Sequence, residues 1–309
     1  MSDWHLKTPV AFIIFNRPDT TERVFAEIAK AKPPKLLVVA DGPRKTRPGE
    51  AEKCAATRAI IDRVDWDCEV LTNYSDVNLG CKNRVASGLD WVFEQVPEAI
   101  ILEDDCLPHP TFFRYCEELL ARYRDDERIG MITGDNFQFG QKRGDASYYF
   151  SRYNHIWGWA SWRRAWQHYD RDVKIWPELR DDGWLEALIK DPGEKKFWAK
   201  TYQSIYEGRI DTWDYQWGLA TWAQGMVSVI PSVNLISNIG FGADATHTHG
   251  ASPYATMPAT AIDFPLRHPR VILPHGEADK FTANGMFSSS FSRRVLQKLK
   301  AKLGSGEKA

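Results

Sequence analysis

The stretch Ala99-Ile100-Ile101-Leu102-Glu103-Asp104-Asp105-Cys106-Leu107-Pro108 places a short aliphatic run directly before three carboxylates. Such a run, entered from Pro97 and left through Pro108, is typical of a strand buried on both faces. Ligands of α/β sheets bind beyond the carboxyl ends of the strands. Adjacent like charges repel one another, so a fold tolerates them best at a solvated rim or around a cation. A solvated acidic turn is the alternative, but the ordered succession of strand, acids and turn favours a metal and diphosphate site.

Other apolar runs of strand length recur along the chain, separated by segments of helical character. The expected strands cover residues 10–15, 36–40, 68–72, 129–133 and 227–231, and the expected helices cover residues 19–30, 50–63, 81–94 and 111–124. Strands that alternate with helices at this spacing predict a parallel sheet with right-handed crossovers. The chain has neither a GxGxxG motif after its first strand nor a P-loop, which disfavours a dinucleotide dehydrogenase and a P-loop kinase.

The composition excludes several classes of protein. The 309 residues carry a formal net charge of −1 and no arginine-rich stripe, so nucleic acid is not expected as a partner. Residues 1–7 lack the apolar run of a signal peptide, and no segment has the ~18 consecutive apolar residues that a membrane span needs. A cytoplasmic location is therefore expected.

Tryptophan is concentrated in the second half of the chain, where ten of the thirteen fall between Trp157 and Trp222. Trp159, Trp162 and Trp166 have helical i, i+3, i+7 spacing, which predicts that they build the core of a small helical layer. A minority of these rings facing a groove would suit the apolar face of a sugar.

Four charged residues of the first half are candidates for ligand binding, and each has a structural alternative. Arg17, Lys82 and Arg84 are placed to hold a phosphorylated ligand, or they are solvated surface cations. Asp41 follows the second strand, where its carboxylate accepts a hydrogen bond from a nucleobase or caps the next turn.

The second half adds a carboxylate and two histidines. Asp214 stands at the start of an amphipathic pattern, where it is either a helix N-cap or a catalytic base. His247 and His249 lie on one side of an extended segment, so either could reach a metal, although a lone histidine is more often structural.

Together these residues resemble the nucleotide-sugar glycosyltransferases of the GT-A fold, most closely the N-acetylglucosaminyltransferase I type. Residues 101–105 and 110–113 are similar to that family's acidic metal motif and the helix after it. Residues 38–41 resemble its base-binding strand end, 158–160 its sugar-site segment, 213–214 its catalytic-base segment and 236–249 its donor-closing loop. The resemblance spans about residues 8–250, although the base segment reads Asp-Tyr here and Asp-Asp in the family.

The resemblance implies a Rossmann-like, mostly parallel sheet flanked by helices, with a tryptophan-rich acceptor-side half. Residues 1–250 would form a single catalytic domain, with a nucleotide-sugar-binding half over 8–135 and an acceptor-side half over 136–250. Residues 251–290 would then be a C-terminal extension, and residues 291–309 a basic amphipathic helix and tail.

The resemblance also assigns roles to individual residues. Asp105 would bind Mn²⁺ or Mg²⁺ at the donor diphosphate, with His249 as a further metal ligand, and Asp214 would be the catalytic base. The donor would contact the residues Arg17, Asp41, Lys82, Arg84, Glu103, Asp104, Trp159 and His247. Residues 238–249 would form a lid over it.

The expected activity is transfer of a hexosyl or N-acetylhexosaminyl group, with inversion, from a nucleotide-diphosphate sugar to a hydroxyl. A UDP-sugar is favoured as donor and a glycan or lipid-linked saccharide as acceptor, in glycan or surface polysaccharide synthesis. The alternatives are a nucleotidyltransferase that acts on sugar phosphates and a non-catalytic carbohydrate-binding protein. Residues 291–303 interleave aliphatic residues with five cations. They are expected to contact an anionic inner membrane face peripherally, or to pack on the domain.

Overall fold

A central sheet of eight strands, in the order β3-β2-β1-β4-β8-β6-β9-β7, organises the computed structural model, which describes residues 4–241, 253–254 and 257–287. Strands β7 and β8 run antiparallel to their neighbours, and the other strands share one direction. The strands of this sheet are β1 (Val10–Ile14), β2 (Lys35–Ala40), β3 (Glu69–Tyr74), β4 (Glu98–Glu103), β6 (Ile129–Thr133), β7 (Tyr148–Ser151), β8 (Trp159–Trp162) and β9 (Val227–Pro231). This arrangement confirms the predicted α/β class and the mostly parallel sheet.

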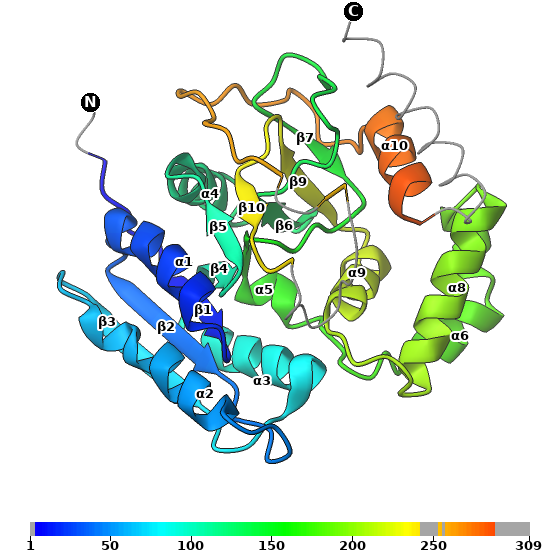
Figure 1. Cartoon of the computed structure of the whole chain (residues 1–309). Coiled ribbons are helices and arrows are strands. Elements are labelled where there is room, and N and C mark those ends of the chain that lie inside the picture. The colour runs from blue at the N-terminus through cyan, green and yellow to red at the C-terminus, as the bar shows by residue number, and fades with distance from the viewer. Residues whose placement is uncertain (1–3, 242–252, 255–256, 288–309) are drawn as a thin grey trace, which may run out of the picture.

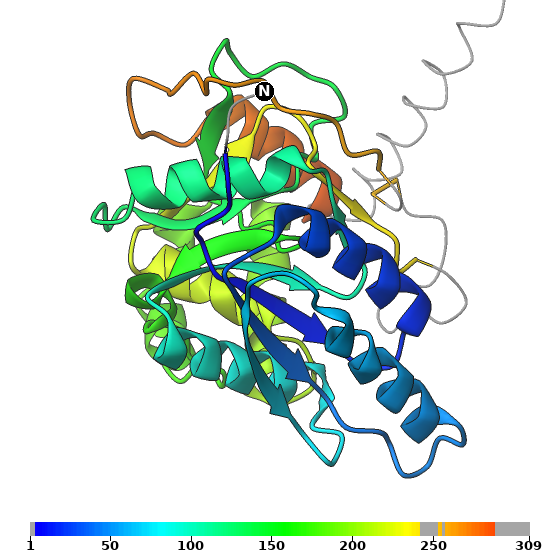
Figure 2. The same ribbon diagram turned by 90° about the vertical axis from the view of Figure 1, so that its left-hand side faces the viewer.

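The helices cover both faces of the sheet. They are α1 (Pro18–Ala31), α2 (Glu50–Ala59), the 3₁₀ turn η1 (Ile61–Arg63), α3 (Gly80–Gln95), α4 (Thr111–Arg122), α5 (Arg163–Trp166), α6 (Trp176–Asp181), α7 (Trp184–Leu188), α8 (Pro192–Tyr206), α9 (Asp214–Ala223) and α10 (Gly276–Met286). One apolar core joins the sheet to α1 and α4, and a second joins it to α3, α5 and α9. Figure 2 shows α1 and α2 side by side on one side of β1–β3, with α3 on the other.

Burial on both faces explains why the central strands are continuous apolar runs. All five residues of β1 are buried, and β4 pairs with it in parallel so that Val10 lies opposite Ile100 and Ile13 opposite Glu103. This register brings the last residue of β4 level with the carboxyl end of β1. The three carboxylates therefore begin where the sheet's hydrophobic interior ends.

The helix predicted from the tryptophan spacing is wrong at its start, because Trp159 and Trp162 belong to strand β8. Residues three apart on a strand point to opposite faces. Trp159 accordingly packs among Trp213 and Trp217, while Trp162 packs on the α4 side and donates to Leu120 O at 3.3 Å. Only the short helix α5, which includes Trp166, follows the expected helical form.

A second, two-stranded sheet joins distant parts of the chain. Strand β5 (Cys106–Pro108) pairs antiparallel with β10 (Ile236–Asn238), immediately after the carboxylates. Helices α6, α8 and α10 lie at the opposite end of the molecule from β3 (Figure 1). Within the part of the chain that the structure describes, no helix is both long and apolar enough to cross a bilayer. Of residues 238–249, on which the lid was predicted, only residues 238–241 are described, and residues 291–303, predicted to form the basic helix, lie wholly outside the described part.

Candidate active site

The acidic residues stand at the tip of β4, where the chain turns at once into β5. Asp104 Oδ2 accepts a hydrogen bond from the backbone N–H of Phe15 at 3.0 Å, which ties the turn to the end of β1. Arg17, just before α1, places Nη1 2.8 Å from Asp105 Oδ2 and 4.0 Å from Asp104 Oδ1. The structure therefore brings together Arg17, Asp104 and Asp105 from two neighbouring strand ends.

These carboxylates carry more negative charge than a buried site normally tolerates. Burial, reinforced by the charge of Asp105, raises the pKa of Asp104 to about 7. Burial also raises the pKa of Glu103 well above its usual value, and the charges of Asp105, Asp104 and Asp214 add to this shift. A divalent cation would reverse both effects, because it stabilises the ionised carboxylates and repays their desolvation.

The same carboxylates provide the oxygen donors that Mn²⁺ and Mg²⁺ prefer. Over residues 4–241, 253–254 and 257–287, no group of three or more His, Cys, Asp or Glu side chains has the geometry to hold a metal ion. In this arrangement Arg17 supplies the positive charge at Asp105 instead. His247 and His249 lie outside the described residues, so the predicted histidine ligand stays a prediction.

The β10 segment passes directly over Asp105. The backbone N–H of Ile239 donates to Asp105 O at 2.8 Å, and a Cβ built on Gly240 would lie only 2.1 Å from Asp105 Oδ2. Asn238 Oδ1 accepts from Gly240 N at 2.9 Å and holds this approach. Only a glycine fits at residue 240 without displacing the Asp105 carboxylate.

Asp214 is the first residue of α9, and Trp213 occupies the N-cap position. The structure thus replaces the predicted N-cap role of Asp214 with a place in the first helical turn, where the helix dipole favours a negative charge. The Thr212 hydroxyl donates to Asp214 Oδ1. Asp214 also contributes to the raised pKa of Glu103, so the two carboxylates from separate halves of the chain lie within electrostatic reach of one another.

Cys81, in the first turn of α3, lies in this acidic region and was not singled out from the sequence. Burial raises the pKa of its thiol, and the charges of Glu103, Asp214, Asp211 and Asp41 raise it further. The thiol is therefore held in its neutral form. Its position behind the strand ends has no local sequence signal, since it depends on where α3 packs.

Of the two roles expected for Asp41, a contact with a nucleobase or the capping of a turn, the structure shows contacts of the second kind. Its two oxygens accept from the backbone N–H groups of Gly42, Leu79 and Gly80 and from the side chain of Asn78, at 2.9–3.2 Å. A carboxylate offers about four acceptor positions, and these four donors fill them. Asp41 therefore anchors the loop that leads into α3.

Three other residues predicted to contact the nucleotide-sugar donor are buried or paired with other residues of the protein. Arg84 is 5% exposed and donates to Asn73 Oδ1 at 2.7 Å, so its guanidinium joins α3 to β3. Trp159 is completely buried, and its ring is out of reach of a ligand. The Lys82 ammonium pairs with Asp172 at 3.1 Å, and the Lys82 backbone N–H donates to Asp211 Oδ1 at 3.0 Å.

Asp135, at the carboxyl end of β6, is a further buried carboxylate that the sequence analysis did not single out. Trp157 N donates to its Oδ2 at 2.9 Å, and its Oδ1 has no hydrogen-bond partner within the described chain. Burial raises its pKa well above the usual value. The signal that would have found it is similar to the one used for Asp41, a carboxylate that follows a buried strand, here two residues after β6 ends.

No family model and no curated protein matches the sequence. A mannosyltransferase from Pyrobaculum calidifontis in complex with GDP-Man and Mn²⁺ is similar in structure, with 12% identity, a TM-score of 0.40 and coverage of 72% of this chain and 70% of that one. A 4-diphosphocytidyl-2C-methyl-D-erythritol synthase from Anaerococcus prevotii has 11% identity and a TM-score of 0.32, over 65% and 84% of the two chains. A UDP-glucose pyrophosphorylase complexed with UDP-glucose has 8% identity and a TM-score of 0.37, over 75% and 93%.

Proposed function

We propose that this protein is a metal-dependent glycosyltransferase of the GT-A type that uses a nucleotide-diphosphate sugar, with a UDP-sugar favoured. The observation that carries this proposal is the electrostatic coupling between Glu103, at the Glu103-Asp104-Asp105 strand tip, and Asp214, the first residue of α9. The strand-tip carboxylates suit a cation that binds the diphosphate of the donor, and the Asp214 carboxylate suits the transfer of a proton. Two chemically distinct carboxylate functions at one sheet edge match the needs of glycosyl transfer.

Asp105, with Asp104 beside it, would hold Mn²⁺ or Mg²⁺, which neutralises the charge that develops on the leaving nucleoside diphosphate. Arg17 lies against the same carboxylates, and its guanidinium is placed to pair with a phosphate oxygen. Glu103 completes the acidic strand tip toward Asp214.

Asp214 would act on the acceptor. Its carboxylate accepts the proton of an acceptor hydroxyl as that oxygen forms a bond to the anomeric carbon of the donor. The bond between the anomeric carbon and the phosphate oxygen breaks, and the nucleoside diphosphate departs with its electron pair. A single displacement of this kind inverts the anomeric centre.

Two isosteric substitutions separate these roles. Asp105→Asn is expected to abolish Mn²⁺-dependent binding of the donor, measured by calorimetry with a panel of UDP- and GDP-sugars. Asp214→Asn is expected to keep that binding and to lower sugar transfer roughly a hundredfold or more, the scale of losing a general base. Asp145→Asn is the matched control, because the Asp145 side chain is 91% exposed in a surface loop.

The same experiment separates the alternatives. Unchanged donor affinity in Asp105→Asn would remove the metal site from the proposal. A protein that releases no sugar from any donor and binds saccharides without Mn²⁺ would be a carbohydrate-binding protein. Dependence on a sugar phosphate and a nucleoside triphosphate would identify a nucleotidyltransferase.

A further inference from the structure

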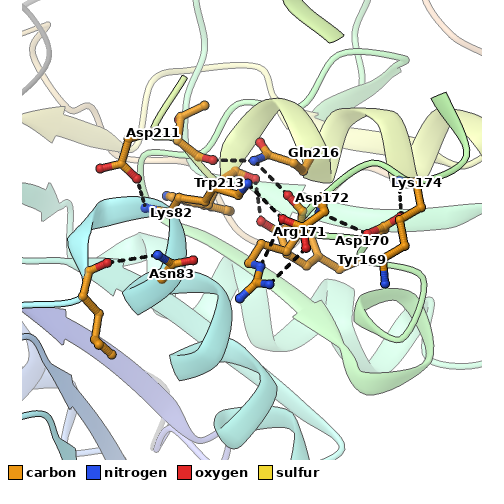
Figure 3. Close-up of polar contacts among 12 residues, drawn as sticks. Lys82, Asn83, Tyr169, Asp170, Arg171, Asp172, Lys174, Asp211, Trp213 and Gln216 are labelled. Carbon is orange, nitrogen blue, oxygen red and sulfur yellow. Dashed lines mark hydrogen bonds and ion pairs between the residues drawn. The ribbon is translucent and has the colours of Figure 1, made fainter. Parts of the chain in front are cut away.

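A surface depression of about 410 Å³ lies between α3 and the segment 169–174 that follows α5. Its volume is within the range of about 300–1,000 Å³ that is typical of small-molecule sites. Asn83, Ser87 and Asp90 line it from α3, one or two helical turns apart, and Tyr169 and Arg171 line the facing wall. Figure 3 shows the amide of Asn83 bonded back to α3, where its Nδ2 donates to Leu79 O at 3.1 Å, with the 169–174 segment and the start of α9 farther along the view.

The 169–174 wall of this depression is hydrogen-bonded to residues on either side of Asp214. The Tyr169 hydroxyl donates to Trp213 O at 3.2 Å, and Gln216 Nε2 donates to Arg171 O at 3.4 Å. The charge of Asp214 also contributes to the raised pKa of Tyr169. These two hydrogen bonds link the wall of the depression to the start of α9, whose first residue is the proposed base.

The lining is held in place before any ligand arrives. Tyr169 stacks on Trp166 with ring centroids 4.2 Å apart and planes 11° from parallel, and Trp166 Nε1 donates to Asp90 Oδ1 at 2.8 Å. Asp170 accepts from the backbone N–H groups of Asp172 and Lys174, which fixes the turn of the wall. A preformed surface loses little conformational entropy on binding.

The charges of the lining favour a neutral ligand. Asp172 pairs with Lys82 at 3.1 Å and with Arg171 at 3.0 Å, and these two cations hold the pKa of Asp172 below its usual value (Figure 3). The lining combines the cations Arg171 and Lys174 with the carboxylates of Asp90, Asp170 and Asp172, so it lacks the excess of cations that binds phosphates. Asn83 and Ser87 are exposed; Asn83 Nδ2 donates to Leu79 O at 3.1 Å and Ser87 Oγ makes only long contacts of 3.4 Å with Arg84, so the Asn83 oxygen and the Ser87 hydroxyl suit a ligand's hydroxyl groups.

We propose that this depression is the acceptor subsite and that it binds the ring of a neutral saccharide, with Asn83, Ser87 and Asp90 as its hydrogen-bonding groups. The inference rests on the proposed glycosyl transfer and adds where the acceptor binds and that the ring bound there is uncharged. The diphosphate of the donor belongs at the strand tip, and the hydroxyl-rich acceptor belongs between α3 and residues 169–174.

The test uses the full-length protein and the p-nitrophenyl glycosides of glucose, galactose, mannose and N-acetylglucosamine as probes. Ligand-observed NMR measures their binding without a donor, and the Michaelis constant for the glycoside is measured in the transfer reaction. Ser87→Trp fills the depression and is expected to weaken glycoside binding and raise this constant at least tenfold. Asn83→Ala, which removes a polar group without filling space, is expected to weaken binding a few-fold.

Gln95→Trp is the matched control, because Gln95 is exposed at the end of the same helix and lies outside the depression. Thermal unfolding of each variant reports on its fold. The inference is overturned if no glycoside binds the wild-type protein, or if Ser87→Trp and Gln95→Trp bind the probes equally well. A wild-type protein that binds glycosides here but turns over no nucleotide-sugar donor would instead contradict the proposed function.

Discussion

Protonation of Asp104 is linked to the stability of the folded protein. Its side chain is 11% exposed, close to the charge of Asp105, and its pKa rises from 3.8 to about 7 on folding. The folded protein therefore binds this proton more tightly than the unfolded chain does. The resulting stabilisation is fully present below about pH 4 and is lost as the pH rises through about 7.

Asp104→Asn is expected to raise the thermal midpoint of unfolding at pH 8 more than at pH 6. The amide oxygen still accepts from Phe15 N, while the charge that opposes folding at pH 8 is gone. Differential scanning calorimetry at the two pH values, with EDTA present, measures the difference. Asp145→Asn serves again as the exposed control. An equal shift at both pH values would mean that the Asp104 carboxylate is already ionised at pH 6.

The pairing of β5 with β10 sets the distance between Gly240 and Asp105, so these two strands control the geometry of the site. Asn238 pairs with Cys106 in this small sheet, so the residues that follow must cross the Asp105 carboxylate. The would-be Cβ of residue 240 meets the oxygen, the carboxyl carbon and the Cβ of Asp105 within 2.8 Å. Rotation of the Asp105 side chain alone cannot relieve all three contacts.

Gly240→Ala is expected to displace Asp105 and to weaken Mn²⁺-dependent donor binding at least tenfold, with a smaller effect on stability. Calorimetric titration gives the affinity, and urea unfolding gives the free energy of unfolding. Gly276→Ala is the control, since a Cβ at residue 276 meets no atom within 4 Å and the residue begins α10. Donor affinity that is the same in both variants would show that the approach of β10 does not matter for binding.

At the scale of the whole molecule, α10 is joined to the sheet by a buried polar contact. Asp279 is 6% exposed and accepts from the Ser151 hydroxyl at 2.6 Å and from Arg152 N at 3.3 Å. Phe287 and Ala283 pack in the same apolar cluster as Trp198 of α8 and Trp222 of α9. Residues 276–287, predicted to lie in a C-terminal extension, thus share a core with helices α8 and α9.

Asp279→Ala is expected to lower the free energy of unfolding by about 1–3 kcal/mol, because it leaves two buried donors without their acceptor. Urea unfolding followed by tryptophan fluorescence measures the change, since α10 packs among these tryptophans. Glu277→Ala, on the exposed side of the same helix, is expected to have little effect. A separate early transition in the wild type would show that α10 unfolds on its own as an extension.

The amino-acid sequence alone determined the parallel strands and the acidic strand tip. Continuous aliphatic runs such as residues 10–14 and 99–102 can bury both faces only inside a covered sheet, whatever the rest of the chain does. The carboxylates that follow must then stand at its edge. This part of the candidate site was predictable because a local pattern is sufficient to specify it.

The tertiary structure decided which polar residues remain for a ligand and on which face each ring lies. Asp41 meets its four donors only when the 75–80 loop is in place, and Arg84 is engaged because α3 packs beside β3. Trp159 and Trp162 form a strand because β4 and β6 offer unpaired edges to β8, a pairing that outweighs their helical spacing. Hydrogen-bond partners and strand neighbours lie far away in the chain, so local sequence does not specify them.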